Sequence, residues 1–120
     1  MSVEKMLAHC NVTYELVYEN KHPEPKGFKK NLIKLLIKNM VVGEMPFKKN
    51  GATAPAFLIK DERSFATEKE RLVSHLQKTQ QLGEVHFKDK ESHSFGHLTT
   101  KEWNIMFSKH LGHHLTQFGV

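Results

Sequence analysis

Two histidines one helical turn apart, His110 and His114, are the residues of this chain whose type and spacing most suggest chemistry. At about 100° of rotation per residue, a helix over 99–118 places both imidazoles in the middle of one face. That face also carries aromatic and aliphatic bulk, namely Trp103, Met106, Phe107, Leu111 and Phe118. Buried imidazoles need polar partners, and a divalent metal ion is one such partner. Two core histidines that each hydrogen-bond a carbonyl or a carboxylate are the other interpretation.

A third histidine, His9, falls in the first expected helix, which starts at Ser2 as N-cap and runs to about residue 19. His9 lies between two apolar sets, so it is either a polar residue near the bundle seam or a third ligand. Its neighbour Cys10 lies in the apolar stripe. We predict that Cys10 packs in the core and does not bind metal, because a reactive thiol needs an electropositive, partly exposed site.

The remaining elements follow from periodicity and from helix-stop residues. A basic amphipathic helix is expected over 28–40 and a third helix from residue 65 to 82, ended by Gly83. Long connections fill 41–64 and 84–98, and the pair Thr99 and Glu102 forms a capping box that opens the last helix. On the third helix the residues expected in the core are Phe65, Leu72, Val73 and Leu76. Those expected in water are Glu68, Lys69, Glu70 and Arg71, with His75 at the surface or flank.

The lysines of the 28–40 helix are predicted to face mainly solvent while its leucines pack on the body. The alternative is a helix that lies on a membrane or on nucleic acid. The net charge is +5, but the chain has only two arginines. Because bidentate arginine contacts are the commonest means of reading bases, we expect no specific nucleic-acid partner.

Length and composition set the broad class. A chain of 120 residues predicts one domain over 1–120. A single cysteine allows no internal disulfide, and no apolar run approaches the roughly 20 residues of a transmembrane segment. The N-terminus has no apolar stretch of signal-peptide type, so a cytoplasmic location is expected.

Two motifs carry a resemblance to a known family: Met6-Leu-Ala-His-Cys10 early in a helix, and His110-Leu-Gly-His-His-Leu-Thr-Gln117 in the last one. With them the chain resembles the DinB-like/YfiT-like helical bundles, a superfamily of metal-dependent enzymes. It is most similar to a branch known only as a domain of unknown function, which also shares Phe95-Gly-His-Leu-Thr99 and Glu102-Trp103. The likeness covers most of the chain.

The resemblance implies an all-α, up-and-down bundle of DinB type with long irregular loops. The family's metal triad falls on His9, His110 and His114, with zinc or nickel as the expected divalent ion, and the three rings should converge on one point. Three imidazoles leave coordination positions open for water, which is the catalytic pattern. His113 and Gln117 are the nearest polar candidates to support the ligands from behind.

The function implied is that of a thiol transferase or hydrolase acting on a small-molecule substrate, with a thiol cofactor as one option. A bound ion would lower the pKa of water or of a thiol. The rival interpretation is a non-catalytic binding module that uses the basic 28–40 helix on nucleic acid or on a membrane surface. The enzyme requires convergent histidines, and the module requires one exposed lysine stripe.

One departure from the family concerns the start of the chain. The family's bundle usually has a helix before the one that carries His9, and here Met1 almost abuts that helix. Either the start is misplaced or trimmed, or the bundle lacks its first helix. Such a loss would expose Val12 and Leu16 and invite a partner chain, so we predict a homodimer. The competing solution is that the 28–40 helix covers this flank.

Overall fold

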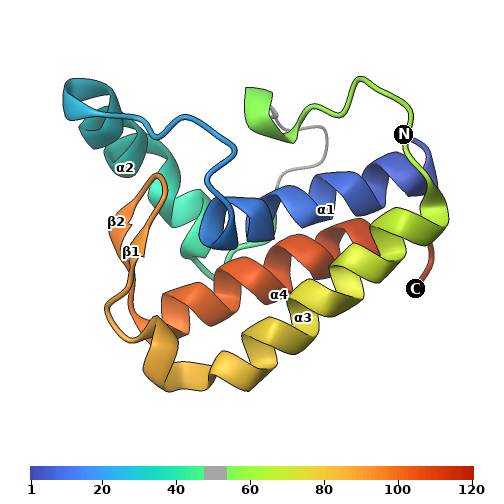
Figure 1. The fold of residues 1–120 in the computed structure, drawn as a ribbon. Coiled ribbons are helices and arrows are strands. Elements are labelled where there is room, and N and C mark those ends of the chain that lie inside the picture. Colours follow the sequence, from blue (N-terminus) through green and yellow to red (C-terminus); the bar gives the residue numbers. More distant parts are fainter. Residues whose placement is uncertain (48–53) are drawn as a thin grey trace.

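The computed structural model describes residues 1–47 and 54–120, which are mainly α-helical (Figure 1). Its elements in chain order are α1 (Val3–Tyr18), α2 (Gly27–Val42), the 3₁₀ helix η1 (Pro55–Phe57), α3 (Phe65–Phe87), β1 (Glu91–Ser92), β2 (Gly96–His97) and α4 (Thr100–Gln117). The predicted all-α class is confirmed. None of the helices in these two ranges is both long and apolar enough to cross a membrane.

Three helices form the body of the molecule. α1 and α3 run in the same direction, and α4 returns between the same two ends in the opposite one (Figure 1). α1 packs against both α3 and α4, whereas α2 packs against α4 and lies beside the β1–β2 hairpin. In the antiparallel hairpin Glu91 pairs with His97 and Ser92 with Gly96. The sequence placed this hairpin inside an irregular connection and did not predict it.

Side-chain hydroxyls cap the starts of three helices, at Ser2 and Thr99 as predicted and also at Ser64. Ser2 and Ser64 each accept a bond from a backbone N–H three residues on, and Thr99 and Glu102 form the expected capping box. These bonds satisfy N–H groups that have no partner inside the helix. Gly83 takes a φ of 68°, which interrupts α3 as predicted. The helix then resumes and continues to Phe87, so the expected end at residue 82 is wrong.

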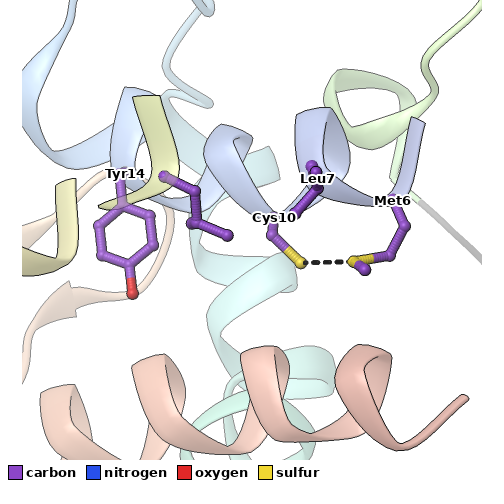
Figure 2. Close-up of a cluster of buried hydrophobic side chains, with 5 residues drawn as sticks. Met6, Leu7, Cys10 and Tyr14 are labelled. Atoms are coloured by element: carbon purple, nitrogen blue, oxygen red, sulfur yellow. Dashed lines mark hydrogen bonds between the residues drawn. The ribbon is translucent and has the colours of Figure 1, made fainter. Parts of the chain in front are cut away.

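Apolar side chains of α1 form the centre of the core. Met6, Leu7, Cys10 and Tyr14 point from α1 toward the other helices (Figure 2). The thiol of Cys10 is 1 % exposed and its Sγ lies 3.7 Å from the Sδ of Met6. Burial raises the pKa of this thiol to about 12, so Cys10 is a packed core residue, as predicted. A second cluster at the hairpin end consists of Val42, Phe87, Leu98 and Trp103.

The orientation predicted for α3 is wrong in part, although Leu72 is buried and Lys69 and Glu70 are exposed as expected. Glu68 is only 4 % exposed, whereas Phe65, Val73 and Leu76 are 46 %, 44 % and 36 % exposed, and of the expected core residues only Leu72 is buried. The reason is a network of charges between α1 and α3. Arg71 donates from Nη1 to Glu68 at 2.8 Å and from Nη2 to Glu15 of α1 at 2.6 Å.

Neutral side chains complete this α1–α3 network. Asn11 is fully buried and donates to Glu68, and His75 bonds to Asn11 at 2.9 Å. His75 also stacks on the ring of Tyr14 with a centroid distance of 5.3 Å. His75 is therefore a half-buried partner in the interface, where the sequence suggested a surface or flank position. The full set of paired polar groups lets α3 turn its polar side inward.

The flank of α1 that the sequence predicted to be open is closed by the chain itself. Val12 is 2 % exposed, and Leu16 is half-buried. The segment that the sequence suggested as an intrachain cover, α2, packs against α4, whereas η1 packs against α1. Val12 and Leu16 therefore do not form the exposed apolar surface from which we predicted a homodimer. The homodimer stays a prediction, but this flank does not support it. At the other end of the chain Phe118, expected on the buried face of the last helix, is 37 % exposed.

The lysines of α2 do not all face solvent. Lys29 and Lys34 are exposed as predicted. Lys30 and Lys38 are half-buried, and their ammonium groups lie 3.2 Å and 3.6 Å from the carboxylates of Glu91 and Glu102. The prediction is wrong for these two because the hairpin and the start of α4 supply carboxylates to the side of α2 that faces the body.

Candidate metal centre

Three histidines converge between α1 and α4. α1 contributes His9, and α4 contributes His110 and His114 from successive turns of one face. Each ring offers one nitrogen that lies within 4.8 Å of those of the other two rings. His9 and His114 are both 8 % exposed. The sequence predicted this convergence of rings, and the structure brings the three residues together.

The separations fit a small divalent ion. The Nε2 atoms of His9 and His110 are 3.1 Å apart. Two imidazoles bound at 2.0–2.1 Å to a tetrahedral ion have their nitrogens about 3.3 Å apart. The ring of His114 meets the ring of His9 edge-on, at a centroid distance of 4.3 Å.

Oxygen atoms hold the outer nitrogen of two of these rings. The Nδ1 atom of His9 lies 3.0 Å from the backbone carbonyl of Phe57 in η1. Because a carbonyl only accepts, His9 carries its proton on Nδ1 and leaves the lone pair of Nε2 free. The Nδ1 atom of His114 lies 3.0 Å from Oε1 of Gln117, which implies the same tautomer. Partners of this kind orient metal-binding histidines in known sites.

The hydroxyl of Thr13 gives His110 a partner in either tautomer. Its Oγ1 lies 3.1 Å from Nδ1 of His110. Without an ion, the hydroxyl can donate to Nδ1 while Nε2–H of His110 donates to Nε2 of His9. With an ion on Nε2, the proton moves to Nδ1 and the hydroxyl accepts. The described residues therefore contain no buried side-chain polar atom without a partner, and the site can lose or gain an ion without creating one.

Burial keeps the three rings neutral. Desolvation lowers the pKa values of His9, His110 and His114, and for His110 the pKa falls to about 3, with the neighbouring imidazoles adding to the effect. The neutral imidazole is the form that binds a metal ion. The cluster is thus neutral at pH 7, which is the charge state that metal binding requires.

A pH dependence of stability follows for the metal-free protein. Since the pKa of His110 is about 3 when folded and near 6.5 when unfolded, only the unfolded state takes up this proton below pH 6.5. Folding should therefore weaken as the pH falls from 6.5 toward 3, by about 2 kcal/mol at pH 5 from His110 alone. Burial shifts the pKa values of His9, His114 and His75 in the same direction, while carboxylates such as Glu15 act only at lower pH.

Urea unfolding in EDTA at pH 7.5 and pH 5.0 measures this loss. The His110→Gln variant should show a smaller difference between the two pH values, because it lacks the group with the largest shift. Equal stability of the native chain at both pH values would contradict the assignment of a buried neutral imidazole.

Aromatic rings and a lysine surround the imidazoles. The ring of Phe57 lies 5.1 Å from His9 and 5.5 Å from His110, measured between centroids. Phe47 meets the rings of His110 and His113 edge-on. The ammonium group of Lys109 lies 4.3 Å from the centre of Phe47 and donates to the backbone carbonyls of Met40 and Gly43 at the end of α2. These contacts place an apolar wall against the cluster.

His113 has a weaker connection to the cluster than Gln117. Its Nε2 lies 3.4 Å from Nε2 of Gln117, a separation longer than that of an ordinary hydrogen bond. Gln117 itself bonds to His114, as described above. The two polar candidates named from the sequence therefore differ: Gln117 hydrogen-bonds a ring of the cluster, whereas His113 meets the ring of His114 edge-on at a centroid distance of 5.1 Å.

Two supporting groups were not identified from the sequence. Thr13 follows His9 by four residues, so the two side chains share one face of α1, and this spacing could have found it. The carbonyl of Phe57 carries no such signal, because any residue type supplies the same backbone oxygen.

Comparisons of the chain with models of protein families, with curated proteins and with solved structures found no match.

Proposed function

We propose that the chain is a metal-dependent enzyme in which His9, His110 and His114 hold a divalent ion, zinc or nickel. The observation that carries this proposal is the arrangement of nitrogens. Three neutral imidazoles from two helices turn ligand atoms toward one another, and two of them are fixed from behind by oxygen acceptors. The resemblance of the two histidine motifs to the DinB-like/YfiT-like bundles supports the same assignment.

The donor set indicates a catalytic site more than a structural one. Structural zinc sites are closed by four protein ligands, whereas three histidines leave room for water or substrate. Such an ion supplies a Lewis acid that lowers the pKa of a bound water or thiol and yields a nucleophile near neutral pH. The chain's own groups would orient the imidazoles, and the rings of Phe47 and Phe57 would limit access of bulk water. Thiol transfer and hydrolysis are the two chemistries that fit.

Metal analysis tests the binding half of this proposal. The protein, produced without a histidine tag and incubated with zinc or nickel, should retain about one ion per chain after gel filtration. The His9→Gln variant should lose it. The His86→Gln variant is the matched control, because His86 lies exposed on α3 away from the cluster. A wild-type chain without bound ion, or a His9→Gln chain that keeps it, would contradict the proposal.

Activity assays test the catalytic half. The metal-loaded protein should hydrolyse an activated ester or transfer a small thiol to an electrophile, and EDTA or His9→Gln should abolish the activity. If the metal-loaded protein turns over neither kind of probe, the assignment to these two chemistries is overturned and only metal binding remains.

The rival function is a non-catalytic module that uses α2 on nucleic acid or on a membrane surface, and its nucleic-acid form is less well supported. It requires one exposed stripe of lysines, but Lys30 and Lys38 are ion-paired to the body of the protein. Only Lys29 and Lys34 of the helix are exposed. This arrangement supports the expectation of no specific nucleic-acid partner.

A further inference from the structure

The outer face of α2 is a ridge of exposed apolar side chains. It consists of Phe28, Leu32, Leu35, Leu36 and Met40, and we call it the α2 ridge. Phe28 is 81 % exposed, and Leu35 and Leu36 are 77 % and 69 % exposed. Their spacing of four, seven and eight residues puts them on one side of the helix. Single exposed apolar residues are common, but a continuous ridge of this kind marks an interaction site.

The opposite side of α2 is fixed to the protein, so the ridge cannot turn inward without breaking other contacts. Lys30 and Lys38 form the ion pairs with Glu91 and Glu102 described above. At the C-terminal end of the helix, Val42 is 3 % exposed and belongs to the second core cluster. Lys109 of α4 binds the backbone carbonyls at the end of the helix. The helix is therefore attached by its basic side and presents its apolar side to the outside.

The charge of the chain is concentrated around this ridge. Residues 21–43 contain six lysines and one carboxylate, that of Glu24. The net charge of this segment is therefore +5, which equals the net charge of the whole chain. The other residues of the chain carry twelve basic and twelve acidic side chains. Of the lysines near the ridge, Lys26, Lys29 and Lys34 are exposed. An occupant of the ridge therefore meets a rim of these three exposed lysines, since Lys21, Lys30 and Lys38 are ion-paired to Glu19, Glu91 and Glu102.

We propose that the α2 ridge docks on an anionic lipid surface. Helices of this composition, with leucine and phenylalanine on one side and lysines but no acidic residues on the other, lie in the plane of a membrane interface. The apolar side chains enter the boundary of the acyl chains, and the exposed Lys26, Lys29 and Lys34 meet the headgroups, which attract positive charge. A second copy of the chain fits less well, because pairing two ridges would bring two positive rims together.

Vesicle flotation tests this proposal. The full-length protein should float with vesicles of phosphatidylcholine containing 30 % phosphatidylserine, and much less with phosphatidylcholine alone or in 0.5 M salt. The double variant Leu35→Glu/Leu36→Glu should bind the anionic vesicles at least about tenfold more weakly. Both positions are exposed, so the variant should keep the helical circular-dichroism spectrum and the melting temperature of the native chain.

Two further variants make the result specific. Val85→Glu changes an apolar residue of α3 that is 90 % exposed and should leave binding unchanged. Lys29→Gln/Lys34→Gln should weaken binding to anionic vesicles and reduce its salt dependence. Equal binding to neutral vesicles, or equal loss in Val85→Glu, would overturn the proposal. Absence of vesicle binding, with light scattering that shows a dimer disrupted by Leu35→Glu/Leu36→Glu, would assign the ridge to a second copy instead.

Discussion

Replacing Arg71 by methionine is expected to destabilise the fold by about 3 kcal/mol, a large part of a typical stability of about 5–15 kcal/mol. The guanidinium joins the carboxylates of Glu15 and Glu68, whose side chains are 8 % and 5 % exposed. Burial raises the pKa of Glu15, and the hydrogen bonds from Arg71 and His22 outweigh it, so this carboxyl stays ionised. Methionine keeps much of the apolar packing and leaves two buried negative charges without their main partner.

Smaller partners keep the expected loss near the lower end of the range for a broken buried pair. Nη1 of Arg63 lies 3.5 Å from Glu68, and Nε2 of His22 lies 2.9 Å from Glu15. Urea unfolding at pH 7.5 measures the change. The control Lys69→Met alters an exposed lysine of the same helix and should change stability by less than about 0.5 kcal/mol.

A rescue experiment separates lost charge pairing from lost packing. The triple variant Arg71→Met/Glu15→Gln/Glu68→Gln removes the uncompensated charges and should recover part of the stability lost in Arg71→Met. A triple variant less stable than Arg71→Met would show that the carboxylates are not the source of the loss.

Local patterns were enough to predict most of the helical framework. The hydroxyl caps at Ser2 and Ser64 and the capping box at Thr99 are interactions within four residues, so the sequence contains both partners. The same holds for the break at Gly83, where a positive φ is easiest for glycine. Apolar periodicity then gave the helix type and, on α1, the buried stripe through Cys10.

The prediction of which helix face is buried was wrong where charged groups from distant segments determine it. Periodicity put Glu68 in water, because an isolated carboxylate avoids the interior. In the fold, Arg71 and Asn11 satisfy it, and Asn11 lies 57 residues away in the chain. The inward lysines of α2 follow the same rule, since Lys30 meets Glu91 across 61 residues. Such pairs cannot be recognised until the topology brings them together.

The histidine cluster was predictable because two independent signals, helical spacing and the family resemblance, indicate the same site. His110 and His114 lie one turn apart in an apolar face, and the family resemblance added His9 from α1. Of the groups that support these histidines, the one near in sequence could have been predicted and the distant one could not. Thr13 lies one turn from His9, whereas the carbonyl of Phe57 reaches the ring of His9 from a segment 48 residues away.

The His110→Gln variant is expected to bind zinc more than about a thousandfold less tightly than the native chain, which corresponds to about 4 kcal/mol. The physical reason is the loss of one of the three imidazoles proposed to hold the ion, the one whose Nε2 lies 3.1 Å from Nε2 of His9. Thr13→Val keeps the shape of the side chain and removes only the hydroxyl that bonds Nδ1 of His110. It should lower the affinity by about 10–100-fold, the usual effect of losing a partner behind a ligand.

Competition with a chromophoric chelator at pH 7.5 measures these affinities. His113→Gln is the matched control, because this histidine is on the same helix next to a ligand but off the shared face, and it should change the affinity by less than about tenfold. The loss of zinc affinity should be largest for His110→Gln, intermediate for Thr13→Val and smallest for His113→Gln. If His113→Gln weakened binding as much as His110→Gln, the ion would not be held by the three converging rings. If Thr13→Val had no effect, the hydroxyl would not orient His110 toward the ion.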